Sequence, residues 1–599
     1  MASPLTDPNK FFSNGAEESV RPSRYELWRE RLARPRSVPT FDSLTGRIQA
    51  FSPGDRLIWY ALLGLLALAS LSSLYALEQR LLVTVPAYGG TLVEGEVGSP
   101  RFINPLLGIS DADRDLAALT YAGLMGPSGD GTLALVLAES YSISPDHKVY
   151  TFTIRKDAKF SDGSQVTAAD IIFTVRKAQD PGLKSPEYAD WAGVAVEAVN
   201  ERTVRFVLSR PYAPFLSLTT LGILPARLWQ NISDEEFPFS NLQTQPVGAG
   251  PFAIESISRD PSGLIGSVLL KANPRYVLGR PYLDSIRFNF YPRTEDLVTA
   301  RASGAIESAY DISSNSGASQ VLSAPYARVF AVFFNPSEKP VFARPEVREA
   351  LSHALDRESI ITGVLGGYAT PIMGPVPPGA GIAQVPVPQA ANPTSAGAQV
   401  LKKAGWIYDG DARIWKQSGG KLVLDGITIR TSNVPELKNV ASAVKGEWEK
   451  LGIPVTIELY EPGDLSQNVI RPRKYQALLY GMVVGRDQDL YAFWASQERN
   501  DPGLNIALYA NKTVDGLLED ARENADAVAR IKDLQKIEDL IAADYPAAFI
   551  YAPNFTYTVP ADLAGIALPQ IVTPKDRFAT VASWYRATDA VWPFLAPNR

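Results

Sequence analysis

The longest apolar run in the chain lies near its amino-terminal end. Residues 57–77 read LIWYALLGLLALASLSSLYAL and contain no charged side chain. A helix of this length, at about 1.5 Å per residue, extends for roughly 30 Å, which is the thickness of the hydrocarbon core of a bilayer. A cleaved signal has only a short basic leader, whereas a long segment precedes this run, so the pattern predicts an uncleaved transmembrane helix.

After a brief linker over residues 78–87, short stretches with strand and helix periodicity follow. Apolar patterns predict strands in TLVEGEV, TVRFVLSRP and ARVFAVFFNP, and helices in TAADIIFTVRKAQD and in the segment that begins at Pro345. Thr167 is the expected N-cap of the first of these helices. PYAPFLSLTTLGILP is expected to be a helix that enters a strand. The mixture favours an α/β body of several domains, since one hydrophobic core rarely serves more than about 300 residues.

Basic residues on either side of the apolar run predict its orientation. Nine Lys or Arg residues lie within residues 1–56, whereas Arg80 is the only one in the first twenty residues after Leu77. By the positive-inside rule, the tail is expected in the cytoplasm and the body on the extracytoplasmic face of the cell membrane. Within the tail, Tyr25, Trp28 and Leu32 have helical spacing among arginines, which fits a short helix on the inner leaflet or a solvated helical turn.

Composition narrows the chemistry that the chain can perform. It has no cysteine and only two histidines, which excludes disulfides, thiolate metal sites and thiol catalysis, and disfavours a histidine-based enzyme. Helical spacing turns His353 away from the apolar face of its helix, so we expect it to be exposed. The net charge of −6 argues against a nucleic-acid groove, and no nucleotide-binding motif occurs. We expect no catalytic activity, cofactor, metal or nucleic acid.

The most suggestive polar cluster follows a predicted strand over residues 477–484. Gly485 predicts a turn that presents Asp487 and Asp489, and aromatic side chains follow at Tyr491, Phe493 and Trp494. A desolvated carboxylate can bind an ammonium group, but the same acids can instead cap a short helix, and the residues alone favour neither. Glu94 and Glu96 could act in acid–base chemistry, but acids two apart are ordinary in a strand.

Five segments, in this order, give the chain a resemblance to a known family. The body resembles the family 5 extracytoplasmic solute-binding proteins, the oligopeptide- and dipeptide-binding receptors of ABC importers, over roughly residues 88–590. The segments are KFSDGSQVTAADIIFTVRKA, GAGPFAIESI, LKANPRYVLGRPYLDSIRF, FFNPSEKPVFARPEVREALSHALDRESII and the stretch from GRDQDLYAFWAS to ANKTVDGLLEDAR.

The resemblance implies a two-lobed α/β fold of three domains, like that of type II periplasmic binding proteins, behind the transmembrane helix. Lobe I would combine residues 88–128, 243–330 and 561–599. Residues 129–242 would form an inserted extra domain, and residues 331–560 would form lobe II. The two lobes would close around an extended peptide.

The resemblance also implies a set of ligand contacts. In the family, the main chain of the peptide pairs with a strand and an acidic residue after that strand holds the amino terminus. Here the strand would be Met482, Val483, Val484 and Gly485, and the acid Asp487 or, less favoured, Asp489. Further cleft residues would be Glu96, Tyr491, Trp494 and Asn505. The family's usual proline is Leu490 in this chain, which leaves the choice of acid open.

Together these features predict a membrane-anchored receptor that captures oligopeptides and delivers them to a separate ABC permease and ATPase. With no cysteine to carry a lipid, the apolar helix would replace the lipid anchor that many relatives have. Two alternatives remain: a peptide sensor or chaperone-like signalling receptor, and an oligosaccharide-binding member of the family. No histidine lies near the predicted site, so nickel uptake is disfavoured.

Overall fold

The computed structural model describes residues 45–595, except 47, 313–318, 380, 389, 420–421 and 525. The chain forms two compact units, one made of Met1–Thr84 with Ala590–Arg599 and the other of Val85–Asp589. The predicted inner-leaflet helix around Tyr25, Trp28 and Leu32 lies outside the described residues.

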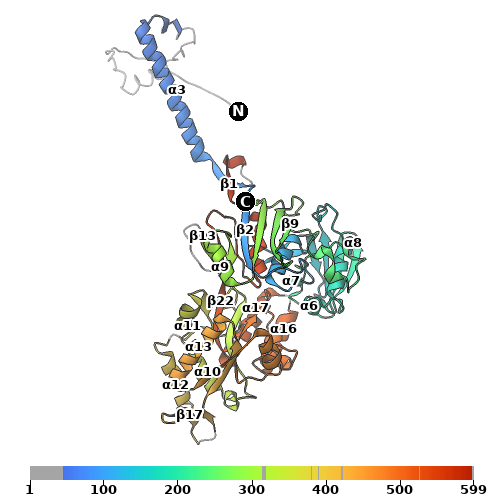
Figure 1. Cartoon of the computed structure of the whole chain (residues 1–599), viewed down its shortest axis with the longest axis vertical. Coiled ribbons are helices and arrows are strands. Elements are labelled where there is room, and N and C mark those ends of the chain that lie inside the picture. The colour runs from blue at the N-terminus through green and yellow to red at the C-terminus, as the bar shows by residue number, and fades with distance from the viewer. Residues whose placement is uncertain are drawn as a thin grey trace, which may run out of the picture. The chain divides into compact units, whose positions relative to one another are not determined.

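The first unit contains the long helix α3 (Pro53–Leu81; Figure 1). Ser52 is its N-cap and accepts a hydrogen bond from the Asp55 backbone nitrogen at 3.3 Å. Residues Pro53–Glu78 have a mean hydropathy of 2.0, and none of the most apolar part is buried against the protein. The helix is therefore long and apolar enough to cross a membrane, and it begins and ends a few residues outside the predicted 57–77.

A four-stranded sheet lies at the start of the second unit. β2 (Thr91–Val97) is parallel to β11 (Ser285–Tyr291), and β10 (Ile265–Ala272) and β9 (Phe252–Arg259) continue the sheet in antiparallel order. Its buried apolar residues form one core with α4 (Asp111–Thr120) and the 3-10 segment η6 (Pro574–Ser583).

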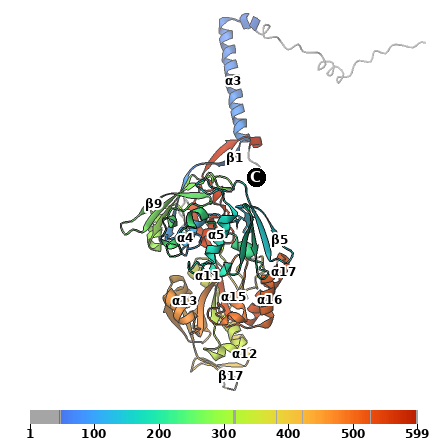
Figure 2. The same ribbon diagram turned by 90° about the vertical axis from the view of Figure 1, so that its right-hand side faces the viewer.

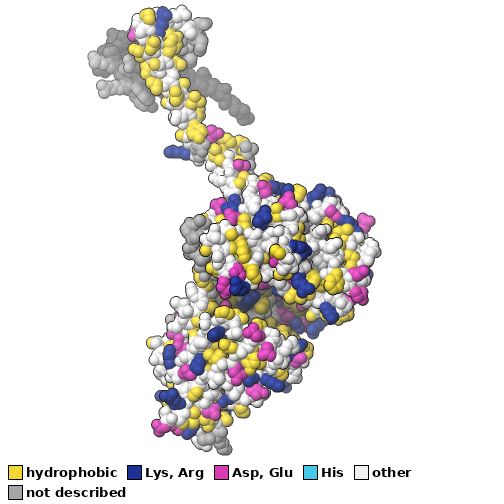
Figure 3. All heavy atoms as spheres, in the orientation of Figure 1, with side chains coloured by type: hydrophobic (Ala, Val, Ile, Leu, Met, Phe, Trp, Pro, Cys, Tyr) yellow, Lys and Arg dark blue, Asp and Glu magenta, His cyan; other side chains and the backbone are white. Residues whose placement is uncertain are grey.

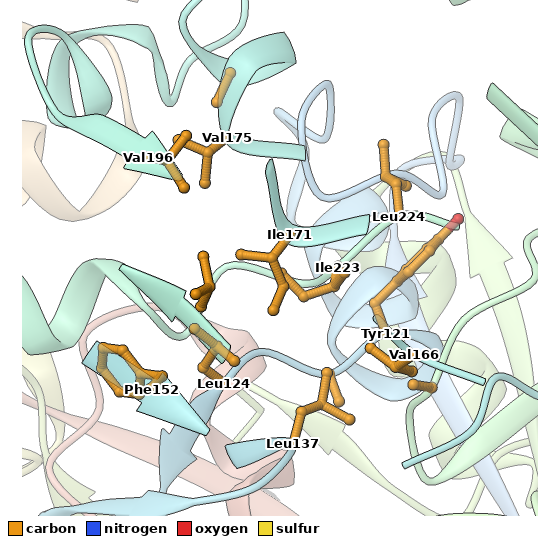
Figure 4. Close-up of a cluster of buried hydrophobic side chains, with 14 of the residues drawn as sticks. Tyr121, Leu124, Leu137, Phe152, Val166, Ile171, Val175, Val196, Ile223 and Leu224 are labelled. Atoms are coloured by element: carbon orange, nitrogen blue, oxygen red, sulfur yellow. The ribbon is translucent and has the colours of Figure 1, made fainter. Parts of the chain in front are cut away.

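A second sheet has the order β5-β6-β8-β7 and its own core. Its strands are β5 (Ala138–Ile143), β6 (Val149–Ile154), β8 (Thr203–Val207) and β7 (Ala195–Asn200). Ile171 and Val175 of α5 (Ala168–Ala178) pack towards Phe152 and Val196 of this sheet (Figure 4). Thr167 is the N-cap of α5, in a capping box with Asp170, as predicted.

The prediction of a helix entering a strand after Tyr212 is wrong. Only the short helix α7 (Phe215–Leu218) forms, and no strand follows it before α8 (Ala226–Trp229). The segment between them packs directly on residues 121–123: the Ile223 nitrogen donates to the Ala122 oxygen at 2.9 Å, and Gly222 leaves no room for a side chain beside Tyr121. Its apolar residues are buried by this contact and need no sheet.

The largest sheet has the order β12-β22-β14-β21-β19-β20, with β13 and β15 also paired to β22. Its strands are β12 (Ala309–Tyr310), β13 (Ser319–Pro325), β14 (Arg328–Phe334), β15 (Ala369–Pro371), β19 (Ile427–Ser432), β20 (Val455–Tyr460), β21 (Ala477–Val483) and β22 (Ala547–Pro560). One face packs on α10 (Pro345–His353), α11 (Arg357–Leu365), α12 (Pro393–Lys403) and α13 (Pro435–Lys450). The other face packs on α15 (Tyr491–Trp494), α16 (Lys512–Glu523) and α17 (Ala527–Asp544). Figure 2 shows α13 and α16 on opposite sides of this part of the molecule.

A ribbon formed by β22 on one side and by β13 followed by β14 on the other connects the core of the β2 sheet with that of the largest sheet. β22 is 14 residues long, and its first half pairs with β14 while its second half pairs with β13. Phe555, Tyr557 and Val559 belong to the core of the β2 sheet, whereas Ala548 and Ile550 belong to that of the large sheet. The division expected from the sequence, at residue 560, would assign all of β22 to lobe II, whereas the strand itself contributes to both cores.

The remaining elements are short. They are β1 (Val83–Ala87), β3 (Met125–Pro127), β4 (Leu133–Leu135), α6 (Tyr188–Trp191), η1 (Phe237–Phe239), η2 (Asn241–Gln243), α9 (Thr294–Ala302), η3 (Pro340–Ala343), β16 (Trp406–Asp409), β17 (Ile414–Gln417), β18 (Val423–Leu424), α14 (Pro462–Asp464), η4 (Leu465–Ile470), η5 (Ser496–Arg499), β23 (Ala587–Val591) and η7 (Pro593–Leu595).

His353 differs from the prediction that it is exposed. It is half-buried at the end of α10, and its Nε2 lies 3.1 Å from the hydroxyl of Tyr545. Tyr545 follows α17, almost 200 residues later, so helical spacing within α10 could not reveal this contact.

Candidate functional site

Within the described residues, the end of β21 has an edge without a partner strand. β14 pairs with β21 along its whole length, but β19 pairs with it only at Ala477 and Leu478. The Val484 nitrogen donates to the Ala327 oxygen of the β14 side at 2.8 Å. Because hydrogen-bonding groups alternate sides in an antiparallel pair, Gly481 and Val483 direct their N–H and C=O groups away from β14. Main-chain groups are thus available for a further strand.

Side chains along the same strand alternate between core and surface. Met482 and Val484 are buried, whereas Val483 is 45% exposed. Gly481 is required by a close approach, since a Cβ atom there would lie 2.6 Å from the ring of Phe330 on β14. The strand was predicted from its apolar run, but the open edge depends on where β19 leaves the sheet and has no local signal.

Asp489 is held by several groups of the protein. Its Oδ2 lies 2.8 Å from Nε of Arg522 and 3.4 Å from the hydroxyl of Tyr212, and its Oδ1 accepts from the Tyr491 nitrogen at 3.2 Å. The Tyr491 nitrogen is the first of α15, whose N-cap is Leu490 and has no side-chain cap hydrogen bond, so Asp489 precedes the N-cap and bonds the first residue of the helix.

Asp487 is less committed to the protein than Asp489. It is half-buried and has no salt bridge with the described residues within 4.0 Å. Burial raises the pKa of its carboxyl, and the nearby Ser217 hydroxyl together with the charge of Arg530 partly opposes this rise. Both aspartates border a small cavity, whose walls include Pro214, Leu518 and Arg530.

Tyr491 lies beside the two aspartates. Its ring is 4.4 Å from the guanidinium carbon of Arg522, and its hydroxyl donates to Oε1 of Gln497 at 3.1 Å. Residues 482–485, Asp487, Asp489 and Tyr491 are thus brought to one loop and strand end.

Trp494 and Asn505 lie elsewhere, inside the core beneath this loop. Trp494 is fully buried and packs against Phe333, Tyr509 and Phe549. Asn505 is also fully buried, and its amide nitrogen donates to the oxygens of Ala495 and Tyr509 at 2.9 and 3.0 Å. The structure therefore gives both residues a supporting role rather than a surface that lines a cleft.

Glu96 belongs to a separate, fully buried ionic cluster under β2. Arg577 lies 2.9 Å from Glu94 and 2.6 Å from Asp115, and the Tyr557 hydroxyl donates to Glu94 at 2.8 Å. The carboxylate of Glu96 has no hydrogen-bond partner among the described residues. Burial, reinforced by the charge of Asp115, raises the pKa of Glu96 well above its usual value, and burial raises that of Asp115 to about 7. Burial therefore favours the neutral form of Glu96.

Several residues of the site come from segments that local patterns do not connect. Nη2 of Arg486 lies 3.3 Å from Asp576, and its Nη1 donates to the Gly131 oxygen at 3.2 Å. The Ala213 nitrogen donates to the Arg522 oxygen at 2.7 Å. The contacts of Arg486 join the loop after β21 to η6 and to the loop between β3 and β4, and the contact of Arg522 joins α16 to the segment before α7. Figure 3 shows the surface hollowed between the upper and lower parts of this unit, with charged side chains along the hollow.

No group of three or more His, Asp or Glu side chains suited to a metal ion occurs within the described residues. The site offers main-chain hydrogen-bonding groups, two carboxylates and several arginines. This set suits a polar, extended ligand with both hydrogen-bonding and charged groups.

Comparison with known proteins identifies the family. The model of the bacterial extracellular solute-binding proteins, family 5 (middle region), matches residues 132–502. The chain is 28% identical over 522 residues to the oligopeptide-binding protein AppA of Bacillus subtilis, covering 84% of this chain and 92% of AppA. It is 26% identical over 445 residues to the glutathione-binding protein GsiB of Escherichia coli, covering 71% and 82%.

Solved structures agree with these matches. The structure of AppA from Bacillus subtilis in complex with a nonapeptide has a TM-score of 0.64 at 26% identity, covering 84% of this chain and all of that one. The ABC transporter substrate binding protein CtaP of Listeria monocytogenes has a TM-score of 0.70 at 26% identity, covering 83% and 99%. The mixed α/β architecture is that of the periplasmic binding proteins. The chain belongs to the family 5 bacterial extracellular solute-binding proteins, a family of receptors and not of enzymes.

Proposed function

We propose that this protein is a membrane-anchored extracytoplasmic receptor that captures oligopeptides and delivers them to an ABC permease and its ATPase. The open edge of β21 is the observation that carries the proposal, since Gly481 and Val483 offer unpaired main-chain groups. Every residue of a peptide except proline has the same donor and acceptor, so pairing at such an edge binds peptides regardless of their sequence. That AppA is a relative with a structure containing a nonapeptide supports this assignment.

Within this proposal, Asp487 binds the amino terminus of the peptide. It follows the open edge by four residues and has no ion pair within the described chain, whereas Asp489 is already paired with Arg522. An ammonium group would satisfy a half-buried carboxylate whose pKa is raised by burial. In this proposal, Val483, Gly485 and Tyr491 lie beside the amino-terminal end of the peptide. The side chains of Met482 and Val484 are buried, so these two residues contribute only their backbone to the binding site.

The proposed division into lobes is based on the cores of the β2 sheet and of the largest sheet, and on the ribbon that connects them. Lobe I comprises residues 88–128, 243–330 and 561–599, with 129–242 as the inserted domain and 331–560 as lobe II, β22 being shared. Helix α3 is the proposed single-pass anchor, with the amino terminus in the cytoplasm. If cell membranes were washed with alkaline carbonate, an anchored protein would stay in the pellet, and release into the supernatant would contradict the anchor.

The central test compares free and N-acetylated peptides. Synthetic peptides of four to nine residues are titrated into wild-type protein, Asp487→Asn and Asp489→Asn by calorimetry. We expect Asp487→Asn to weaken binding of free-amine peptides roughly 10- to 100-fold while leaving N-acetylated peptides unchanged. Asp489→Asn is the matched control and should affect both classes by a similar, smaller factor. Equal losses for both classes in Asp487→Asn would reject the amine role.

Native mass spectrometry of the purified protein separates this proposal from its alternatives. A bound sugar without peptide would replace it by oligosaccharide binding. If peptide uptake in cells were unchanged after deletion of the permease, with peptide binding intact, a sensor or chaperone-like receptor would be favoured instead.

A further inference from the structure

Arg328 lies where the two lobes meet, beside the open edge of β21. It is the first residue of β14 and pairs directly with Val483. Cross-strand partners project from the same face of a sheet, so Arg328 and the exposed side chain of Val483 are neighbours. Two residues before it, Tyr326 belongs to the core of the β2 sheet. Arg328 therefore occupies the crossing point of the ribbon.

The guanidinium of Arg328 is held in place by an aromatic ring. Its carbon lies 3.9 Å from the centre of the Tyr326 ring, and Tyr326 is 5% exposed and so fixed in the core. Stacking on a fixed ring orients the planar group and leaves its edges free to donate hydrogen bonds.

This guanidinium has no anionic partner in the described chain. Its Nε is buried without an acceptor, and no carboxylate of the described residues lies within 4.0 Å of it. The two fully buried arginines are both satisfied, Arg577 by two carboxylates and Arg357 by backbone oxygens that include those of Phe549 and Ser352. Arg56 and Arg301 also have a buried Nε without an acceptor among the described residues, but only Arg328 lies beside the open edge of β21. A half-buried charge without a partner is unfavourable unless a ligand supplies one.

Asp311 interacts electrostatically with both Arg328 and Glu436, but neither acid lies within 4.0 Å of the Arg328 guanidinium. Asp311 is exposed, yet the surrounding protein desolvates it and raises its pKa to about 6, against the opposing charge of Arg328. Glu436, in the first turn of α13, is bound instead by the Tyr551 hydroxyl at 2.6 Å.

We propose that Arg328 binds a carboxylate of the captured peptide and makes the site selective for peptides that carry one there. The inference rests on the proposed function. The carboxylate is either the carboxyl terminus or an Asp or Glu side chain, because a guanidinium fork binds both through two parallel hydrogen bonds.

The test uses synthetic hexapeptides of alanine in which one Glu is moved along the sequence. Each has a matched Gln peptide, and each is made with a free and an amidated carboxyl terminus. Calorimetry with wild-type protein is expected to show binding that is roughly 10- to 100-fold tighter for one carboxylate than for its amide. If the peptide with a free carboxyl terminus binds more tightly than its amidated form, Arg328 binds the carboxyl terminus. If one Glu peptide binds more tightly than its matched Gln peptide, Arg328 binds a side chain at that position.

Arg328→Gln should abolish this preference and leave the affinity for the all-amide peptides unchanged, and Arg328→Lys should retain part of it. Arg287→Gln, which removes the same charge from an exposed position of β11, is the matched control. Circular dichroism confirms that each variant is folded. Equal affinity of the wild-type protein for acids and amides, or an equal loss for both in Arg328→Gln, would overturn the assignment of Arg328. If no hexapeptide bound the wild-type protein, the proposed function itself would fail.

Discussion

The ends of β2 and β21 carry the same sequence pattern with opposite outcomes. Each has two acids spaced two residues apart, Glu94 and Glu96 in one case and Asp487 and Asp489 in the other. The first pair is fully buried, where Arg577 pairs with one acid and burial raises the pKa of the other. The second pair borders the surface, with one acid paired and one uncommitted. The fate of an acid at a strand end depends on which cation the fold brings to it.

The largest effect is expected from removing the cation of the buried cluster. Arg577→Met leaves Glu94 and Asp115 without their partner inside the core, and breaking a buried ion pair in this way typically destabilises by about 3–5 kcal/mol. Urea unfolding measures the change. Arg522→Met, which removes the partly exposed partner of Asp489, should change the free energy of unfolding by at most about 1 kcal/mol. Equal losses in the free energy of unfolding of the two variants would contradict the contrast between the acids of β2 and those that follow β21.

A second substitution tests the strand edge itself. Gly481→Val forces atoms into the ring of Phe330, and overpacking of this kind destabilises by about 1–3 kcal/mol. It should also weaken peptide binding, measured by calorimetry, because Gly481 presents main-chain groups to the ligand. Gly266→Val on β10, where a Cβ atom meets nothing within 4 Å, is the control for stability and binding. Undiminished peptide affinity in Gly481→Val would argue against pairing at this edge.

The protonated acid of the β2 cluster gives a pH-dependent effect. Folded protein holds a proton on Glu96 at pH values above the ordinary pKa of 4.5, where the unfolded chain has lost it. The free energy of unfolding therefore falls as the pH rises through this range. Glu96→Gln removes the titration, so its stability relative to wild type should rise between pH 5 and pH 8, measured by urea unfolding at each pH.

Asp487→Asn provides the contrast at the other strand end. Burial also raises the pKa of Asp487, but the group is only half-buried, so the same pH series should show a smaller gain. A gain as large as that of Glu96→Gln would mean that Asp487 is as desolvated as the buried cluster, and would weaken its assignment as an accessible ligand contact.

The smallest effect is expected from Asp489→Asn. The amide keeps the hydrogen bond to the Tyr491 nitrogen and loses only the charge that faces Arg522. Thermal unfolding should show a loss of less than about 1 kcal/mol. A loss of 3 kcal/mol or more would show that Asp489 resembles the buried acids of β2 and not a surface ion pair.

Local patterns predicted the elements well where neighbours in sequence decide the structure. The strands β2, β14 and β21 and the capped start of α5 follow from apolar alternation and from the residue type at Thr167. The segment after Tyr212 was missed because its apolar residues are covered by residues 121–123, a contact that periodicity does not contain.

The site was predictable only in part, for the same reason. The loop that carries Asp487 and Asp489 could be predicted, because two acids follow an apolar run that predicts a strand. Glu96 has the same signal, but it lies in the buried cluster in which Arg577 pairs with Glu94. Arg577 follows Glu94 by 483 residues, so the burial of Glu96 could not be foreseen. Trp494 and Asn505 lie beside the loop in sequence, yet their side chains face the core. Arg328 has no sequence signal, because its proposed role rests on a feature of the folded chain: no carboxylate of the described residues lies within 4.0 Å of its guanidinium.

The ribbon of β13, β14 and β22 has a consequence for how the protein unfolds. Because β22 supplies side chains to the cores of the β2 sheet and of the largest sheet, melting of either core releases a strand that the other one needs. These two cores should therefore lose structure in one cooperative transition in calorimetry, whereas the β5-β6-β8-β7 sheet, which has a core of its own, can melt as a separate step.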